Sequence, residues 1–191
     1  MLVSKSDAMA PGRHGAPGPD PVRIALAGRS VVQLAARKGR AADLSARIQA
    51  EFGFALPGPG KSAGANEVFA LWIQPESWML LAPDTVEGAC ARRYKEAAGD
   101  AGSVVDQTHG RSVFTLSGTR AAWVMSKLCR IDFHPGAFTA GSVAVSPVAG
   151  LSCTIHKRDA DTYELVVFTT LSRSFAELLT HAADETGYVI A

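Results

Sequence analysis

The sequence lacks any long apolar run. No segment approaches the ~20 consecutive apolar residues that a membrane-spanning helix needs, and the N-terminal stretch lacks the apolar core of a secretory signal peptide. It also lacks an excess of one charge, since 19 Lys and Arg residues are balanced by 18 Asp and Glu residues among 191. Such a chain does not carry the basic footprint of a dedicated nucleic-acid binder. We therefore expect a protein that binds neither nucleic acid nor a membrane.

Cysteine is scarce, and its spacing offers no metal site. The three cysteines are too far apart to form a C-x-x-C pair, and each lies among apolar neighbours. Free cysteine is among the most buried residue types in proteins. We predict buried free thiols at Cys90, Cys129 and Cys153, which fits the reducing environment of the cytoplasm.

Signatures of catalysis and cofactor binding are absent as well. The sequence contains no H-E-x-x-H, no G-x-G-x-x-G after a strand, and no serine or cysteine nucleophile with a recognisable partner. Gly60-Lys61-Ser62 lacks the glycine that a phosphate-binding loop places five residues earlier, where Ala55 stands. The histidines are scattered without ligand spacing, at His14, His109, His134, His156 and His181. We predict no catalytic, cofactor-binding or metal-binding residue in this chain.

The first residues offer little to a core. Residues 1–22 are rich in Pro, Gly and Ala and contain few apolar side chains to bury. We expect residues 1–30 to form a disordered N-terminal arm, or an extended segment that lies on a partner.

Apolar periodicity then predicts alternating strands and helices. In the first half, residues 31–107, we predict a strand, a helix that ends at Gly53, a strand pair at 68–73 and 78–82, a second helix and a last strand. Asp84, with Glu87 three residues on, has the layout of a capping box at the start of the second helix.

The second half repeats this plan. Residues 112–190 predict a strand, a helix, a strand pair, a helix and a short tail, although the two halves share little sequence identity. Each half is a split β-α-β unit that would expose one apolar sheet face. We predict an α+β fold in which residues 31–191 form a single body of two pseudo-repeats, 31–107 and 112–190, packed together.

A hairpin is predicted where the two halves meet. Residues 103–106 are rich in β-branched side chains, Gly110 can supply the positive φ of a turn, and residues 112–116 alternate like a return strand. Asp106 and Arg111 flank the turn, and we expect them to form a structural ion pair across it. A contact with substrate is the alternative.

A cluster of aromatic residues follows the hairpin. The helix expected over residues 119–129 buries an apolar stripe, and Trp123 points obliquely off that face. The loop after it adds Phe133 and Phe138 around His134-Pro135. Because large apolar rings are costly to expose, we predict that these five residues contact a partner protein. Two alternatives are open: the rings fill the gap between the two halves, and His134 stabilises its own turn.

Three segments of the middle third carry a family resemblance. They are V-V-D-Q-T-x-G-R from Val104, L-S-G-x-R-A from Leu116 and C-x-I-D-F-H-P-x-A-F from Cys129. In this order they resemble the sarcosine oxidase gamma subunit family. A fainter pattern, which ends in Asp161-Thr162-Tyr163-Glu164-Leu165-Val166-Val167, is shared with the folate-binding aminomethyltransferase (glycine-cleavage T protein) superfamily. The resemblance covers roughly residues 68–187.

The resemblance implies a fold and a function. The fold would be similar to the N-terminal part of the folate-binding aminomethyltransferases. The chain would be a non-catalytic gamma subunit in a heterotetramer with alpha, beta and delta subunits. In that family the complex converts sarcosine to glycine and passes the one-carbon unit to tetrahydrofolate or releases formaldehyde. FAD, FMN, NAD and tetrahydrofolate are expected in the partner subunits and none in this chain.

Three other functions stay open at this point. The chain could be a free-standing folate-dependent aminomethyltransferase-like protein, a subunit of a related N-methyl amine oxidase or dehydrogenase, or a small assembly or repair factor of the same superfamily.

Overall fold

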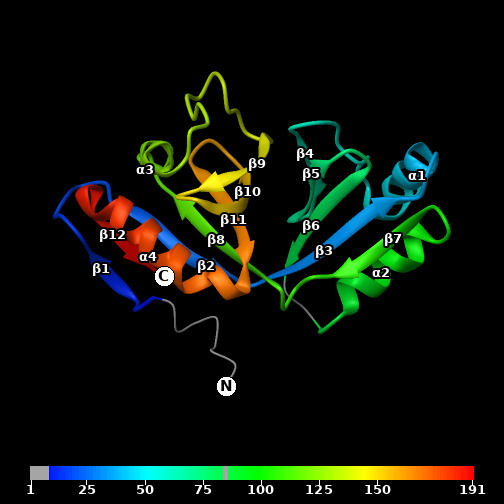
Figure 1. Cartoon of the computed structure of the whole chain (residues 1–191), viewed down its shortest axis with the longest axis horizontal. Helices are drawn as coiled ribbons and strands as arrows, with labels where there is room; N and C mark the ends of the chain where they lie inside the picture. The colour runs from blue at the N-terminus through cyan, green and yellow to red at the C-terminus, as the bar shows by residue number, and fades with distance from the viewer. Residues whose placement is uncertain (1–8, 84–85) are drawn as a thin grey trace. The chain divides into compact units, whose positions relative to one another are not determined.

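The computed structural model describes residues 9–83 and 86–191 and divides the chain into two compact units (Figure 1). One unit is formed by Gly28–His109. The other combines residues 9–27 with Gly110–Ala191, so the polypeptide leaves this unit and returns to it. We call them the inserted unit and the split unit. Each has its own sheet and its own helices.

The inserted unit is a five-stranded antiparallel sheet with two helices. Its strands lie in the order β4-β5-β6-β3-β7. Its elements are β3 (Arg29–Ala36), α1 (Ala41–Phe52), β4 (Ser62–Ala65), β5 (Val68–Gln74), β6 (Ser77–Pro83), α2 (Ala89–Ala98) and β7 (Gly102–Asp106).

The helices of the inserted unit cover one face of its sheet. Leu44 and Ile48 of α1 and Tyr94 of α2 are fully or almost fully buried, because the apolar positions of each helix recur at helical spacing. They pack on sheet residues that alternate along their strands, such as Leu34 and Leu80. Burying a large apolar side chain contributes about 1.5–3 kcal/mol relative to leaving it exposed.

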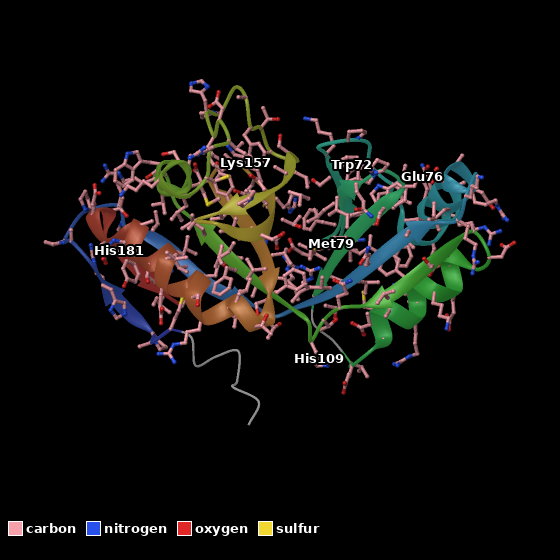
Figure 2. All side chains as sticks on the ribbon, viewed as in Figure 1. Trp72, Glu76, Met79, His109, Lys157 and His181 are labelled. Atoms are coloured by element: carbon pink, nitrogen blue, oxygen red, sulfur yellow. The ribbon has the colours of Figure 1, made fainter. Side chains whose placement is uncertain are left out.

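The strands β5 and β6 of the inserted unit pair antiparallel, with an irregularity between Trp72 and Gln74. Trp72 of β5 lies opposite Trp78 of β6, and Figure 2 shows the side chains of Trp72 and Met79 on these two strands. The indole Nε1 of Trp78 donates a hydrogen bond to the carbonyl of Pro57, 2.8 Å away. This bond fastens the loop between α1 and β4 to the sheet.

The split unit is a seven-stranded sheet with two α-helices and two short 3₁₀ helices among its described residues. Its strands lie in the order β1-β12-β2-β8-β11-β10-β9. Its elements are β1 (Gly12–His14), β2 (Val22–Ala27), β8 (Arg111–Ser117), α3 (Ala121–Leu128), β9 (Val143–Val148), β10 (Leu151–Lys157), β11 (Thr162–Phe168), the 3₁₀ helix η2 (Thr169–Leu171), α4 (Ser172–Ala183), the 3₁₀ helix η3 (Asp184–Thr186) and β12 (Tyr188–Ile190).

The core of the split unit lies between its sheet and the helices α3 and α4. Alternate residues of β8, β10 and β11 face the helices, which is the expected pattern for a sheet covered on that side. Phe114 of β8 meets Phe175 of α4 with ring centroids 5.2 Å apart. Pro147 sits in β9, an edge strand, where the missing N–H removes no bond from the interior of the sheet.

The predicted duplication is confirmed, with one strand, β4, that the predicted plan of the first half lacked. The series β3-α1-β4-β5-β6-α2-β7 in the inserted unit recurs as β8-α3-β9-β10-β11-α4-β12 in the split unit. The sheet orders β4-β5-β6-β3 and β9-β10-β11-β8 correspond as well. The α+β fold class is therefore confirmed, while the packing of the two halves into a single body stays a prediction.

The N-terminal residues break the symmetry of the duplication. In the inserted unit β7 lies beside β3, but in the split unit β2 occupies the matching place beside β8. The strand β12, the counterpart of β7, is displaced by one position and pairs parallel to β2. The expectation of a disordered or extended arm is therefore wrong for β1 and β2, which pair with other strands of the sheet. Val22 and Ile24 of β2 are fully buried. Composition missed β2 because the segment is short and its partner β8 lies about ninety residues away in the chain.

The predicted hairpin over residues 103–116 is also wrong. The strand β7 pairs with β3 in the sheet of the inserted unit, and β8 pairs with β2 and β11 in the sheet of the split unit. Gln107 continues from β7 and donates its backbone N–H to the carbonyl of Val31, 2.8 Å away. Both segments are strands, as predicted, but a local strand pattern does not specify which sheet a strand joins.

The predicted capping box of α2 lies partly outside the described residues. Asp84, the first residue of the predicted capping box, falls in the gap at 84–85. The helix begins at Ala89, and its N-cap position is Gly88, with a positive φ of 69°. Glu87 is exposed, and its carboxylate lies 3.1 Å from Nε2 of His109.

Candidate functional site

Trp123 is a partly exposed ring between two cations. It lies on α3 with 39% of its surface exposed. The Nζ atom of Lys127 lies 3.5 Å from the centroid of the ring, and the guanidinium of Arg120 lies 5.3 Å from it. Lys127 also donates to the carbonyl of Ala182 (2.9 Å) and contacts Glu185 (3.0 Å). The indole is therefore held on the surface of α3 by cation–π contacts, with a basic rim.

Phe133 and Phe138 do not belong to this surface. They are 4% and 7% exposed and lie in the core of the split unit. Phe133 contacts Tyr163 edge to face with centroids 5.8 Å apart, and Phe138 stacks on the same ring at 6.4 Å. The expectation that both rings lie outside the core is therefore wrong. Their spacing follows neither helix nor strand, so the core contact was invisible in the sequence.

His134 and Pro135 are exposed, and His134 stabilises its own turn. Its Nδ1 atom accepts a hydrogen bond from the backbone N–H of Gly136 (3.1 Å), and its own N–H donates to the carboxylate of Asp132 (2.9 Å). Its carbonyl accepts from the N–H of Phe138 (2.9 Å). Because Nδ1 accepts, the neutral ring carries its proton on Nε2. These contacts support the alternative in which His134 stabilises its own turn.

Asp106 and Arg111 lie in different units. The carboxylate of Asp106 accepts from the backbone N–H of Thr108 at 2.9 Å. Partial burial acts to raise the pKa of Asp106, but the two hydrogen bonds from Thr108 and the charge of His109 outweigh it and lower the pKa. The guanidinium of Arg111 lies 3.7 Å from the centroid of Phe168, and burial lowers its pKa. The ion pair between Asp106 and Arg111 stays a prediction, although the hairpin that suggested it is not formed.

All three cysteines are free thiols, as predicted. Cys129 and Cys153 are buried, and Cys90 is half-buried. Burial, with a smaller effect from the charge of Asp106, raises the pKa of Cys90 to about 11. This thiol therefore stays protonated near neutral pH.

A cavity of about 430 Å³ opens in the inserted unit. It lies beside α2, near the ends of β5 and β6 and the turn that joins β4 to β5. Its lining residues are Phe52, Asn66, Val68, Ala82, Pro83, Ala89, Cys90, Arg93 and Tyr94. Sequence reasoning missed it, because these residues come from four separate segments that share no motif.

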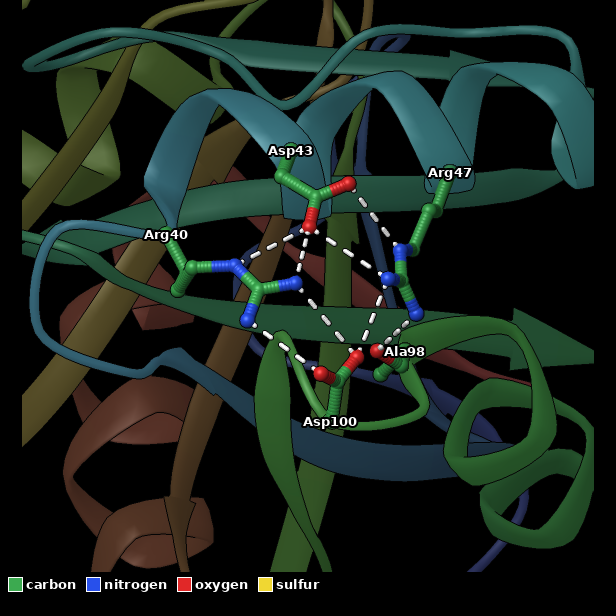
Figure 3. A network of polar contacts seen from close by, with 5 residues as sticks. All are labelled: Arg40, Asp43, Arg47, Ala98 and Asp100. Carbon is green, nitrogen blue, oxygen red and sulfur yellow. Dashed lines mark hydrogen bonds and ion pairs between the residues drawn. The ribbon is translucent and has the colours of Figure 1, made fainter.

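Two arginines and two aspartates join α1 to the turn before β7 (Figure 3). Asp43 accepts from both Arg40 and Arg47, and Asp100 pairs with the same two arginines at 3.2 and 3.0 Å. Hydrogen bonds from Arg40 are the largest cause that lowers the pKa of Asp43 and of Asp100. The i, i+3 and i, i+4 spacing of Arg40, Asp43 and Arg47 is a signal that the sequence does contain. The four side chains are partly exposed, as expected for a structural network rather than a catalytic one.

Within residues 9–83 and 86–191, no three His, Cys, Asp or Glu side chains gather in a way that could hold a metal ion. In the same residues, no helix combines the length and apolarity that a crossing of the bilayer would require.

Comparison with known proteins gives a family match. The model of the sarcosine oxidase, gamma subunit family matches residues 38–185. The sarcosine oxidase subunit gamma of Arthrobacter sp. is 34% identical over 108 residues, which are 56% of this chain and 53% of that protein. Its counterpart from Corynebacterium sp. strain P-1 is 36% identical over 94 residues, 48% of this chain and 45% of that protein. In both comparisons the chain spans about half the length of the curated relative.

Two solved structures share the fold. A chain of the heterotetrameric sarcosine oxidase from Corynebacterium sp. U-96 aligns with a TM-score of 0.79 and 24% identity, over 90% of this chain and 88% of that chain. The glycine cleavage system aminomethyltransferase T from Bartonella henselae aligns with a TM-score of 0.67 and 15% identity, over 90% of this chain and 48% of that chain. The predicted similarity to the aminomethyltransferase fold is therefore confirmed.

Proposed function

This chain belongs to the sarcosine oxidase, gamma subunit family, and we propose that it acts as the gamma subunit of a multi-subunit sarcosine oxidase. The family match over residues 38–185 carries the proposal, because it spans most of both units. The two relatives from Arthrobacter and Corynebacterium support it. The complex would oxidatively demethylate sarcosine to glycine and pass the one-carbon unit to tetrahydrofolate or release it as formaldehyde.

In this complex the chain has a structural role. Its partners are the alpha, beta and delta subunits, and these carry FAD, FMN, NAD and the tetrahydrofolate site. Several polar residues that could serve chemistry are used in internal contacts: His134 in its own turn, and His156 with Glu164, whose Nδ1 and Oε2 lie 3.0 Å apart. We place the complex in the cytoplasm, where three free thiols are maintained.

A candidate contact with a larger subunit lies on the split unit. Trp123 supplies a large exposed ring with a basic rim, and His134 and Pro135 are exposed on the loop that follows α3. Trp is enriched among the residues that dominate binding energy at protein interfaces. Phe133 and Phe138 support this surface from within the core.

Co-expression with the other subunits tests the proposal. The chain should co-purify with flavoprotein subunits in fixed stoichiometry, and the complex should show flavin absorbance and oxidise sarcosine. The chain purified alone should be colourless and inactive. A chain that elutes separately from subunits that are themselves fully assembled and active would overturn the proposal.

The fold favours one second candidate, a folate-dependent aminomethyltransferase-like protein, because of the match to aminomethyltransferase T. Titration of the isolated chain with tetrahydrofolate separates the two functions. Saturable binding by the chain alone would favour the second candidate. A panel of N-methyl amines, offered to the assembled complex, distinguishes a sarcosine oxidase from a related N-methyl amine oxidase.

A further inference from the structure

The cavity of the inserted unit has the size and walls of a small-molecule site. Its volume of about 430 Å³ falls within the range of roughly 300–1,000 Å³ that is typical of ligand pockets. The aromatic ring of Phe52 and the side chains of Val68, Ala82 and Pro83 provide apolar walls. Such walls suit the apolar body of an organic ligand.

Tyr94 lines this cavity and carries an unsatisfied hydroxyl. Its side chain is 1% exposed, and its hydroxyl has no hydrogen-bond partner in the part of the chain that the structure describes. The ring is fixed by stacking on Phe52, with centroids 4.1 Å apart. Side chains on a helix point back toward its N-terminal end, and Cys90, one turn earlier on α2, lines the same cavity. A buried hydroxyl without a partner costs free energy, so a ligand that accepts a hydrogen bond from it would recover that cost.

The polar groups of the lining are mostly donors. Burial raises the pKa of Tyr94, so its hydroxyl stays protonated at neutral pH. Arg93 uses Nε on Glu51, 3.0 Å away, and carries further N–H donors on its two terminal nitrogens. Asn66 adds an amide, and none of the lining residues that the structure describes carries a carboxylate. A group that only accepts hydrogen bonds and carries negative charge complements this lining.

We propose that this cavity binds a small organic carboxylate with a flat apolar body. The body packs between Phe52, Val68 and Pro83. The carboxylate accepts a hydrogen bond from the hydroxyl of Tyr94, and Arg93 supplies the complementary charge. The site belongs to the inserted unit and is separate from the proposed contact at Trp123. It does not depend on the function proposed for the complex.

Calorimetric titration of the full chain with 2-naphthoate tests the site. We expect saturable binding of 2-naphthoate. The affinity for the neutral 2-naphthamide should be lower by about tenfold or more, because a hydrogen bond to a charged group is worth more than one to a neutral group. Tyr94→Phe should weaken naphthoate binding about tenfold or more, by the same reasoning. Arg93→Gln should weaken naphthoate binding more than naphthamide binding.

The chain offers a matched control for each variant. Tyr163→Phe removes the other tyrosine hydroxyl that is buried without a partner among the described residues, but from the split unit. Arg92→Gln removes the neighbouring charge on α2, from a residue that does not line the cavity. Both controls should bind naphthoate like the unmodified chain.

Alkylation of Cys90 gives a second readout. Cys90 is the half-buried thiol, and Cys129 and Cys153 are buried. Bound naphthoate should slow the reaction of Cys90 with N-ethylmaleimide, as followed by mass spectrometry of the peptide. A melting curve of each variant establishes that it is folded; if Tyr94→Phe does not fold, Arg93→Gln and naphthamide still test the site. Absence of saturable binding at millimolar naphthoate, equal affinity for acid and amide, or equal effects of variants and controls would each overturn the proposal.

Discussion

The ring of Phe133 packs edge to face against the ring of Phe138, with centroids 5.5 Å apart and an interplanar angle of 73°. Both rings also contact Tyr163 of β11. The polar loop between α3 and β9 is therefore fastened to the core of the split unit by two aromatic side chains. Only its other residues, such as His134 and Pro135, remain exposed for a partner.

Phe133→Ala should destabilise the chain strongly. Removal of a buried aromatic ring leaves a cavity and costs about 3–5 kcal/mol. Chemical denaturation of the isolated chain measures this loss, with Trp123→Ala as the control, because Trp123 is much more exposed. A loss below about 1 kcal/mol, the central value for point mutants in general, would mean that the loop is not anchored by this ring.

Trp123→Ala should weaken assembly instead of folding. An interface anchor of this kind contributes on the order of 2 kcal/mol or more to association, while the free chain loses little stability. Binding to the other subunits can be measured by titration, with Phe168→Ala as a control. Phe168 is another exposed ring with a cation over it, and it is 44% exposed. Unchanged association of the Trp123 variant would remove Trp123 from the interface.

The arginine–aspartate network should make stability depend on pH in the acid range. The pKa values of Asp43 and Asp100 are held below the ordinary value of 3.8, chiefly by hydrogen bonds from Arg40. A carboxylate with a depressed folded pKa stabilises the fold above its unfolded pKa, and this stabilisation is lost as the pH falls through the folded pKa. The contribution should therefore be complete at pH 6 and decline below pH 3.8.

Asp43→Asn tests this dependence. The variant should be less stable than the unmodified chain at pH 6, and the difference should shrink as the pH falls below 3.8. High salt should also reduce it, because the four side chains are partly exposed. Asp20→Asn, an exposed carboxylate outside the network, is the control. A pH-independent difference between the Asp43 variant and the unmodified chain would contradict the electrostatic origin.

Gly99→Ala should destabilise the chain more than Gly53→Ala does. Gly99 ends α2 with φ 52° and ψ −127°, and a Cβ atom there would approach Nη1 of Arg47 to 2.6 Å. Gly53 ends α1 in the left-handed helical region, with nothing within 4 Å of the added atom. Alanine in the left-handed region costs roughly 1–2 kcal/mol, and a conformation open essentially to glycine costs about 1–3 kcal/mol. Urea denaturation measures both variants, and equal losses would show that Arg47 yields without cost.

Element types were predictable, because their periods are local. Leu44 and Ile48 recur at helical spacing, Leu151, Cys153 and Ile155 alternate, and Gly53 ends its helix, as expected. The repeat of the two halves also followed from the order of these elements. The family resemblance followed from short segments around Asp106, Gly118 and His134, which are contiguous in the chain.

The site was less predictable. The sequence identified Trp123 as a ring off the core face of its helix, but it placed Phe133 and Phe138 on the same surface. Burial of a loop residue depends on whether a distant side chain, here Tyr163, offers a complementary ring. The cavity at Tyr94 was not predicted, because it is formed by residues from separate segments that become neighbours only in the folded unit.

The amino-acid sequence by itself determined most of the helices and strands, the duplication, the family and the free thiols, since each of these follows from local periodicity, contiguous segments or composition. Only the tertiary structure decided which sheet each strand joins. It separated β7 from β8, placed β2 beside β8 in the position that β7 holds beside β3, and displaced β12 outward. The physical reason is that a strand's partner is selected by complementary faces and backbone groups on segments far away in the chain, and no local pattern encodes that choice.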